Sequence, residues 1–315
     1  MKKEEFLDAV YEAVKRVFLD YVVQVNEIEK ANGIKTTGVV CGNPDSNLAP
    51  VTYIDDILND INIGKIDEAT GMNQIVERVI EDAHSTLETN IDVLKLRDFD
   101  SVKDMVYGRL MSFADNKERL KDTPAVRWNN LVIEYRILIS KDQQGMASAL
   151  VDNTLLKEWG INKAELVSVA DENTKRMFPY EARSIMELLK DRFDVSPEEF
   201  GIEDIEPEQQ MIVMSNVNNM DGAICMTDTD FVKSVSERYF GGESIFILPS
   251  SRHEVIAVSK DFKAREMLDM VSEINKTVLD KSDYLSTSVY EYDATKQKVH
   301  CVATETPVEK KKHSR

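Results

Sequence analysis

The sequence has little of what disulfide-stapled, redox-active or membrane-spanning proteins depend on. Its three cysteines among 315 residues are far apart, odd in number and without a CxxC pair, which argues against a zinc cage or a redox pair. No run approaches the roughly 18 consecutive apolar residues of a transmembrane helix. The two lysines after Met1 are followed at once by Glu4 and Glu5, which disfavours an export signal. We therefore expect a cytoplasmic protein, where free thiols persist.

The signatures of the commonest enzyme classes are also absent. The sequence has no GxxxxGK[ST] phosphate loop, no GxGxxG after a strand, no GxSxG nucleophile elbow and no HExxH zinc helix. We predict neither a cofactor nor a metal, and the absence of these motifs favours a protein that is not an enzyme.

Positive charge is scarce as well. Lysine and arginine number 39 against 57 aspartates and glutamates, for a formal net charge of −18. Such a chain repels nucleic acids and anionic membranes, so we expect neither as a partner. Residues 197–210 are strongly acidic and are predicted to be a solvated connection, although a cation or a basic partner could use them. The only basic cluster lies in residues 306–315, which we predict to be a disordered tail.

What the sequence does contain is typical of a globular chain. Hydrophobic residues make up 42% of it, and a chain of this length can bury roughly three quarters of its unfolded surface. Residues 1–123 are predicted to be a mainly helical region with a short hairpin at 22–51, where Asn32 and Gly33 suit a turn. Apolar residues recur at helical spacing in four segments: 6–21, 54–58, 72–87 and 99–110.

Residues 124–305 are predicted to form an α+β domain. Dense β-branched or alternating residues predict strands at 131–140, 146–151, 211–215, 222–226, 244–248, 255–258, 288–292 and 298–303. A helix is predicted to start at Asn162, with Glu165 in a capping-box position, and to end at Pro179. Further helices are predicted at 182–189, 230–239 and 264–278, and another helix start at 196–199. Because strand pairs alternate with helices, the predicted fold class is α+β, with a helix-rich N-terminal half and a mixed or antiparallel sheet with packed helices in the C-terminal half.

The most chemically suggestive segment is the corner at residues 249–254, between two predicted strands. It places Ser250, Ser251, His253 and Glu254 within five positions. In a catalytic interpretation, Ser250 or Ser251 is a nucleophile, His253 is its base and a distant acid completes a triad. In a structural interpretation, which we prefer, the serines bond the turn backbone while His253 and Glu254 tie the hairpin to a neighbouring helix.

Two further residue pairs that contain carboxylates, considered as possible metal or catalytic sites, also have structural interpretations. His253 and Glu254 would point to opposite faces of a regular strand, which argues against a metal site. Asp228 and Asp230 form a carboxylate pair in sequence, but we expect them to cap the helix that begins there.

Several segments carry a resemblance to a known family: Asn-Gly at 32–33, NLAPVTY at 47–53, Trp-Gly at 159–160, Asn-Thr at 173–174, Phe-Pro at 178–179, LSTSVYEYD at 285–293 and, most specific, LPSSRHE at 248–254. On these residues the chain resembles a bacterial group, domain-of-unknown-function family fifty-six eighty-eight, over most of its length. The resemblance implies a cytoplasmic protein of Gram-positive anaerobes, often encoded near mobile elements. It implies no activity, so it assigns no catalytic residue.

Three functional hypotheses follow. The preferred one is a non-enzymatic interaction or regulatory protein with a protein partner, based on the acidic surface and the missing catalytic motifs. The second is a hydrolase or transferase centred on Ser250, Ser251 and His253, which predicts a pocket at the corner with an acidic residue close to His253. The third is nucleic-acid mimicry by the acidic surface.

Overall fold

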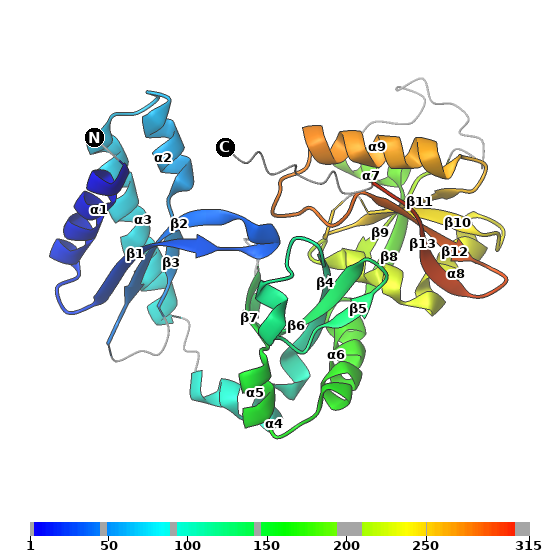
Figure 1. Cartoon of the computed structure of the whole chain (residues 1–315), viewed down its shortest axis with the longest axis horizontal. Coiled ribbons are helices and arrows are strands. Elements are labelled where there is room, and N and C mark those ends of the chain that lie inside the picture. The colour runs from blue at the N-terminus through cyan, green and yellow to red at the C-terminus, as the bar shows by residue number, and fades with distance from the viewer. Residues whose placement is uncertain are drawn as a thin grey trace, which may run out of the picture. The chain divides into compact units, whose positions relative to one another are not determined.

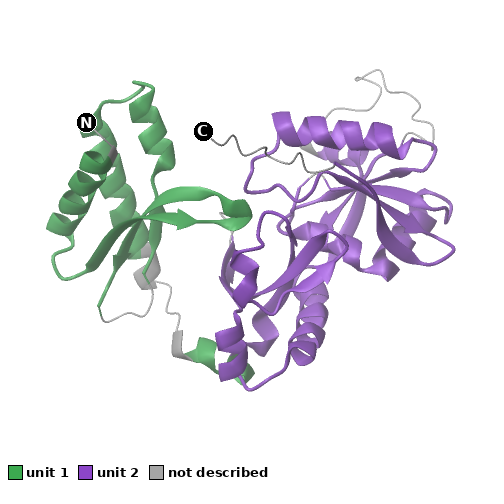
Figure 2. Ribbon diagram, in the orientation of Figure 1, with its two compact units in different colours: residues 1–101 green, residues 102–315 purple. Residues whose placement is uncertain are grey.

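The computed structural model describes residues 3–44, 49–88, 93–141, 146–193, 210–249 and 251–305 (Figure 1). The chain has an α+β fold, and the strand pairs in these ranges are all antiparallel. The predicted fold class is therefore confirmed. The chain divides into two compact units, residues 1–101 and 102–315, which Figure 2 colours separately.

The first unit combines a three-stranded sheet, ordered β1-β2-β3, with helices that pack on it. Its elements are α1 (Lys3–Val17), β1 (Val22–Glu29), a 3-10 turn (Ala31–Gly33), β2 (Lys35–Gly42), β3 (Val51–Tyr53), α2 (Asp55–Asn62), α3 (Glu68–Glu88) and a 3-10 helix (Val93–Arg97). The short helix α4 (Phe99–Val102) lies at the boundary between the units.

The core of this unit follows the apolar stripe of α1. Phe6, Val10 and Val14 are buried in one cluster with Val39 of β2, as their helical spacing predicts. Of the predicted stripe, Val17 is exposed where the helix stops, whereas Tyr21 beyond the helix end packs against this cluster. The predicted hairpin is confirmed, and β1 pairs with β2 along the whole length of both strands.

The second unit contains two antiparallel sheets. In the smaller one, β6 pairs with β4, β5 and β7; the larger one has the order β13-β12-β10-β11-β9-β8, so β8 and β13 are its edges. The strands are β4 (Val106–Ser112), β5 (Val126–Trp128), β6 (Leu131–Lys141), β7 (Met146–Leu150), β8 (Tyr180–Ser184), β9 (Ile212–Asn216), β10 (Ile245–Leu248), β11 (Val255–Ser259), β12 (Ser288–Asp293) and β13 (Lys298–Thr304).

Two helices of the second unit, α6 (Lys163–Met177) and α8 (Thr229–Tyr239), begin at the caps that the sequence predicts. The others are α5 (Asn153–Glu158), α7 (Ile185–Phe193) and α9 (Ala264–Thr277), with 3-10 turns at Lys103–Met105, Arg119–Asp122 and Gly222–Thr227 (η7). The Asn162 side chain accepts a hydrogen bond from the Glu165 N–H at 3.0 Å and starts α6. Helix α9 packs on β10, β12 and β13 of the larger sheet and buries Leu268 and Val271 there (Figure 1).

A polar contact joins the two sheets of this unit. The amide nitrogen of Asn130, in the turn before β6, donates to the hydroxyls of Ser286 and Ser288 at 3.1 and 2.9 Å. Its amide oxygen accepts from the buried Tyr290 hydroxyl at 2.5 Å, and the Tyr290 ring packs 5.5 Å from Trp128. The smaller sheet is therefore fastened to β12 of the larger one.

Two of the predicted elements are wrong, and a third starts later than predicted. The helix predicted at 99–110 ends at Val102, and Val106 starts the buried strand β4; a four-residue step keeps one face in a strand as well as in a helix, so the pattern is ambiguous. The helix predicted at 182–189 begins only at Ile185, because the residues before it pair with β9 as β8. The strand predicted at 222–226 is the buried 3-10 turn η7.

The boundary predicted after residue 123 differs from the division of the structure, which falls between Ser101 and Val102. The reason is that β4 pairs with β6 and so belongs to the second unit. Some predicted features lie outside the described residues: the turn at 143–145, the helix start at 196–199, the acidic run up to residue 209 and the tail at 306–315. Among the helices that the structure describes, none has the length and apolar character needed to cross a bilayer.

Candidate functional site

The corner predicted as a candidate active site joins β10 to β11. Ser251 is buried there, and its Oγ accepts hydrogen bonds from the N–H groups of His253 and Glu254 at 3.0 and 3.3 Å. The same hydroxyl donates to the Glu254 carboxylate at 3.3 Å. Ser250 lies outside the described residues. Ser251 thus bonds the backbone of its own turn, which is the contact that the structural interpretation expects.

Both ring nitrogens of His253 have partners. Nδ1 accepts a hydrogen bond from the N–H of Asp221 at 3.2 Å, and Nε2 lies 3.2 Å from Oδ1 of Asp283. Because Nδ1 is the acceptor, the neutral ring carries its proton on Nε2, and this N–H donates a hydrogen bond to Asp283. The imidazole thereby ties the corner to two loops that are distant in sequence.

The candidate catalytic residues therefore lie close together, but their hydrogen bonds do not connect them as in a catalytic triad. The hydrolase hypothesis expects an acidic residue within reach of His253, and Asp283 occupies that position. A triad also needs an imidazole nitrogen directed at the nucleophile's hydroxyl. Here the second nitrogen is engaged by a backbone N–H, so the contacts run from Asp221 through His253 to Asp283.

A chain of charges runs inward from Asp283. Arg252 Nε donates to Oδ1 of Asp283 at 3.1 Å, and its Nη1 lies 3.3 Å from Oδ1 of Asp221. Oδ2 of Asp221 lies 3.9 Å from Nη1 of Arg109. Arg109 in turn donates from Nε and Nη2 to Oε1 of Glu134 at 2.9 and 2.5 Å. These contacts connect the corner of the larger sheet to the middle of the smaller sheet.

Glu134 is the centre of this chain, and its side chain is completely buried. It also accepts hydrogen bonds from Arg119 on Oε2 and from Arg136 on Oε1, the latter at 3.2 Å. Burial alone would raise the pKa of the Glu134 carboxyl, but the three guanidinium charges outweigh it and lower the pKa below its usual 4.5. We call the following set the ionic chain: Asp283, Arg252, Asp221, Arg109, Glu134, Arg119 and Arg136.

The register between β4 and β6 builds the inner half of the ionic chain. Arg109 lies directly opposite Glu134, and Tyr107 directly opposite Arg136. Alternate residues of a strand share one face, so the four side chains form a polar face on an otherwise apolar sheet. Water has little access to this face, because Tyr107, Arg109 and Glu134 are buried. Arg136 is partly buried.

A tight turn before η7 brings Asp221 to both the corner and Arg109. Asp221 has a left-handed backbone with φ of 52°, and Gly222 follows it. A Cβ atom on Gly222 would lie 2.5 Å from the carbonyl oxygen of His253 and 2.8 Å from the backbone nitrogen of Asn216. Only glycine lets these backbones approach so closely.

Sequence reasoning missed the ionic chain, although one signal was present. Within the apolar run of β6, Glu134 and Arg136 are two residues apart and therefore share a face. Two charges on the same face of a strand that is otherwise buried predict partners from elsewhere in the fold. Nothing in the sequence indicates that Arg109 and Asp221 are those partners.

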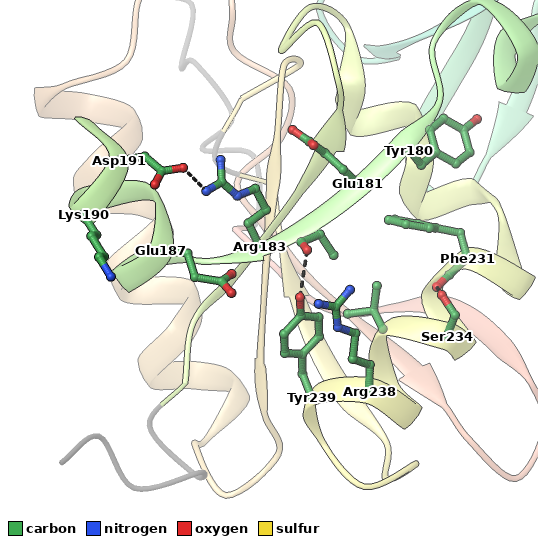
Figure 3. Close-up of a pocket in the computed structure, with 12 residues that line it drawn as sticks. Tyr180, Glu181, Arg183, Glu187, Lys190, Asp191, Phe231, Ser234, Arg238 and Tyr239 are labelled. Atoms are coloured by element: carbon green, nitrogen blue, oxygen red, sulfur yellow. Dashed lines mark hydrogen bonds and ion pairs between the residues drawn. The ribbon is translucent and has the colours of Figure 1, made fainter. Parts of the chain in front are cut away.

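A cavity of about 640 Å³ opens along the edge strand β8 (Figure 3). Its walls come from β8, α7 and α8, and we call it the β8 cavity. The rings of Tyr180 and Phe231 pack 5.3 Å apart at one end. Near the other end, the hydroxyl of Tyr239 donates to the carbonyl of Ala182 at 2.8 Å, a contact that Figure 3 marks with a dashed line.

Some charges of the β8 cavity have roles within the fold. Ser184 and Glu187 form a capping box that starts α7: the Ser184 N–H donates to the Glu187 carboxylate at 2.8 Å, and the Glu187 N–H donates to the Ser184 hydroxyl at 3.1 Å. Arg183 pairs with Asp191 (Figure 3).

Other charges of the cavity have no such role. Glu181, Lys190 and Arg238 form no ion pair with any residue that the structure describes. Arg238 is exposed, and its guanidinium lies 4.8 Å from the centre of the Tyr239 ring. In Figure 3 this guanidinium lies among the cavity-lining side chains, close to Tyr239.

A second cavity, of about 260 Å³, lies between α6 and the start of α8, and we call it the α6 cavity. Trp128 and Tyr180 form aromatic walls. Lys175 Nζ lies 2.6 Å from Oδ2 of Asp228, whose Oδ1 caps α8. Asp171 also lines the cavity. The residue as a whole is exposed, but partial burial of its carboxyl raises its pKa; the Lys175 charge opposes this rise and the Asp228 charge adds to it.

The structure assigns the predicted carboxylate pair a structural role at α8. Asp228 Oδ1 accepts hydrogen bonds from the N–H groups of Asp230 and Phe231 at 3.0 and 3.1 Å, as expected of an N-cap. Within the described ranges, no three histidine, cysteine, aspartate or glutamate residues are grouped so that they could hold a metal ion.

Comparison with known proteins agrees with the resemblance drawn from the sequence. No curated protein and no solved structure matches the chain significantly. The profile of a family of unknown function, DUF5688, matches residues 3–294, which include the corner, the ionic chain and both cavities. Since this match covers almost the whole chain, the protein belongs to the DUF5688 family.

Proposed function

We propose that this protein is a non-enzymatic interaction or regulatory protein that binds a partner protein in the β8 cavity. One observation carries the proposal: Glu181, Lys190 and Arg238 surround an opening of about 640 Å³ without an ion-pair partner in the described residues. Charges that a fold uses for itself are paired or capped, as those of Arg183 and Glu187 are. Aromatic residues and arginine, which line this cavity at Tyr180, Phe231 and Arg238, are enriched at surfaces that contact another protein.

The contacts of the corner support binding over catalysis. The Ser251 hydroxyl and both nitrogens of His253 are engaged in bonds that hold three loops together. A general base needs a free lone pair directed at the proton it removes. The corner therefore has the bonding expected of a brace, which leaves the β8 cavity as the better candidate for function.

A partner would contact the side chains of the cavity more readily than the backbone of the edge strand β8. The hydrogen bond from the Ile185 N–H to the Met211 carbonyl sets the register of β8, so the backbone groups of its even-numbered residues point away from β9. Of these groups, the Ala182 carbonyl is engaged by Tyr239 and the Ser184 N–H by the capping carboxylate of α7. An added strand would have to displace both contacts.

A cytoplasmic location is part of this proposal. All three cysteines, Cys41, Cys225 and Cys301, are free thiols, which a reducing compartment maintains. Burial raises the pKa of the Cys41 thiol to about 11, so it is a poor nucleophile and a poor target for oxidation at neutral pH.

The proposal is tested by affinity capture from cells of the source bacterium with the full-length chain as bait. Ser234 is exposed at the cavity wall, and Ser234→Trp fills the space that a partner would occupy. Arg238→Ala removes the exposed guanidinium. We expect one protein to be captured in stoichiometric amount by the wild type and lost with both variants.

The matched control is Glu237→Trp, an equally bulky change at an exposed position of α8 that does not line the cavity. It should capture the same partner as the wild type. Capture that is unaffected by both cavity variants would contradict the proposal. So would a monodisperse monomer without a partner across several growth conditions.

The hydrolase hypothesis stays a prediction, and one contact favours it: His253 and Asp283 form the imidazole–carboxylate pair that a triad contains. A fluorophosphonate probe tests it directly. Labelling of the wild type that is lost in Ser251→Ala and His253→Ala, but kept in Ser259→Ala, would establish a reactive serine. Absence of labelling is the result that the binding proposal expects.

A further inference from the structure

The two cavities of the second unit lie along the same helix. The β8 cavity follows α8 from Phe231 to Tyr239, and the α6 cavity reaches the start of this helix at Asp228. Tyr180 lines both cavities, and its ring packs on that of Phe231. We call the two cavities together the α8 groove.

The middle of the α8 groove is apolar. Tyr180 and Phe231 form an aromatic pair there, with Trp128 on the side of the α6 cavity and Val235 on the side of the β8 cavity. Aromatic walls of this kind bind the side chains of a ligand through apolar burial and stacking. The middle of the groove therefore suits aliphatic or aromatic side chains.

The two ends of the groove carry opposite charges that are not used within the fold. At the α6 end, Lys175 is paired with Asp228, while Asp171 has no hydrogen bond or ion pair in the described part of the chain. At the other end, Asp191 is paired with Arg183, while Arg238 has no ion pair there with a described residue. Among the described residues, the groove thus offers an unpaired negative charge at Asp171 and an unpaired positive charge at Arg238, while the unpaired charges of Glu181 and Lys190, which also line the β8 cavity, are opposite in sign to each other.

The length of α8 sets the distance between these ends. Asp228 caps the start of α8 and lines the α6 cavity together with Asp171, and it is ten residues from Arg238; at 1.5 Å per residue, the α6 cavity and Arg238 are therefore about 15 Å apart along the helix axis. An extended chain rises by about 3.3 Å per residue, so four or five residues span this distance. One turn of a helix, about 10 Å wide with its side chains and about 5.4 Å long, has a volume of about 420 Å³, which is more than the 260 Å³ of the α6 cavity, so the thinner extended chain suits this cavity better.

We infer that the α8 groove binds an extended peptide segment of the partner, with a lysine or arginine side chain at Asp171 and a carboxylate at Arg238. The two charges are about four or five residues apart, with apolar side chains between them. This inference rests on the proposed function and names the part of the partner that enters the groove.

The test is a selection of random dodecapeptides on the immobilised full-length chain. We expect enriched peptides to carry a basic residue about four or five positions from an acidic residue or from the terminal carboxylate. For an enriched peptide, Asp171→Ala and Arg238→Ala should each weaken binding about two- to fivefold, which is the range for partly exposed ion pairs.

Charge reversal makes the test specific for each end. Asp171→Lys should weaken an enriched peptide further than Asp171→Ala, and a peptide whose basic residue is replaced by glutamate should regain affinity for this variant. Arg238→Glu should behave in the same way toward a peptide whose acidic residue is replaced by lysine. The controls are Glu172→Lys, next to Asp171 but not lining the cavity, and Arg265→Glu on α9.

Enrichment without the charge pattern, absence of any enrichment, or binding that ignores both reversals would overturn the inference. Affinity capture separates this failure from failure of the proposed function. A partner that is still captured by the wild type and lost with Ser234→Trp would leave the β8 cavity as a binding site, with only the peptide pattern rejected. Loss of both results would reject the site itself.

Discussion

The ionic chain and the α8 groove are both rich in charge, yet they differ in how the charges are satisfied. In the ionic chain, Glu134 is completely buried and bonded to three arginines. In the groove, Asp171 and Arg238 are exposed and form no ion pair with described residues. Burial and pairing therefore mark charges that hold the fold together, whereas exposure without a partner marks charges available to a ligand.

The largest effect should come from Glu134→Ala. The substitution leaves Arg109, Arg119 and Arg136 in a buried cluster without their shared counter-charge. Loss of one partner of a buried charge set costs about 3–5 kcal/mol in the free energy of unfolding. Denaturant unfolding followed by circular dichroism measures this loss. Glu237→Ala, on the exposed face of α8, should stay within about 0.5 kcal/mol of wild type.

The contribution of Glu134 should also depend on pH. Its folded-state pKa is lowered, so the stabilisation is fully present above the ordinary carboxyl pKa of 4.5 and is lost as the pH falls through the folded-state value. The gap in stability between wild type and Glu134→Ala should therefore narrow on acidification. A gap that is constant down to acid unfolding would show that the carboxylate charge is not what the arginines need.

Gly222→Ala should have the next largest effect, because it tests the turn that holds the ionic chain against the corner. The new Cβ would lie 2.5 Å from the His253 carbonyl oxygen, and backbone cannot move aside cheaply. We expect a loss of about 3 kcal/mol, at the upper end for overpacking. Gly160→Ala is the control for backbone strain without a clash, because φ at Gly160 is 67° and the space around it is open. This variant should lose only about 1 kcal/mol in the free energy of unfolding.

His253→Ala distinguishes bracing from catalysis. It removes the acceptor for the Asp221 N–H and the donor to Asp283, which should cost about 1–3 kcal/mol. His84→Ala, at an exposed helical position, should cost almost nothing. Peptide affinity of the folded His253→Ala protein should equal that of wild type. If the stability of His253→Ala instead equals that of wild type, the imidazole does not brace the corner.

Much of the fold could be predicted where only one periodicity fits the residues. Helix α9 buries Leu268 and Val271 at helical spacing, as the sequence predicts. The spacing of Val106 and Leu110 predicts a helix but also suits a strand, and pairing with β6 decides between the two. Backbone pairing with a distant segment cannot be read from local periodicity.

The candidate sites were only partly predictable for the same reason. Ser251, His253 and Glu254 are neighbours in sequence, so their meeting at one corner could be foreseen. Their partners come from about thirty residues away, and only the fold brings Asp283 to the imidazole. Charges such as Arg238 resemble any solvated helix face in sequence, because a cavity beside them depends on how α7 and β8 pack.

The smallest predicted effect concerns Asp171, whose carboxyl interacts electrostatically with Lys175 on its own helix, with Asp228 at the start of α8, and with the hydroxyls of Tyr135 and Tyr180. Burial raises its pKa, so between the ordinary 3.8 and the raised value the folded state holds more protons than the unfolded state. Stability therefore falls as the pH rises through this window. Asp171→Asn should raise the melting temperature slightly at neutral pH, with no difference from wild type in acid below pH 3.8.

Asp228→Asn should change the melting temperature in the opposite direction from Asp171→Asn, although both residues line the α6 cavity. Burial would raise the pKa of Asp228, but the hydrogen bonds from Lys175 and from the start of α8 hold it below 3.8. Its charge therefore stabilises the fold at neutral pH, and the Asn variant should melt lower than wild type. A cationic peptide in the groove should lower the pKa of Asp171 and cancel the advantage of Asp171→Asn. If both variants instead lower the melting temperature, the Asp171 charge stabilises the fold just as that of Asp228 does, and the groove has no free negative end.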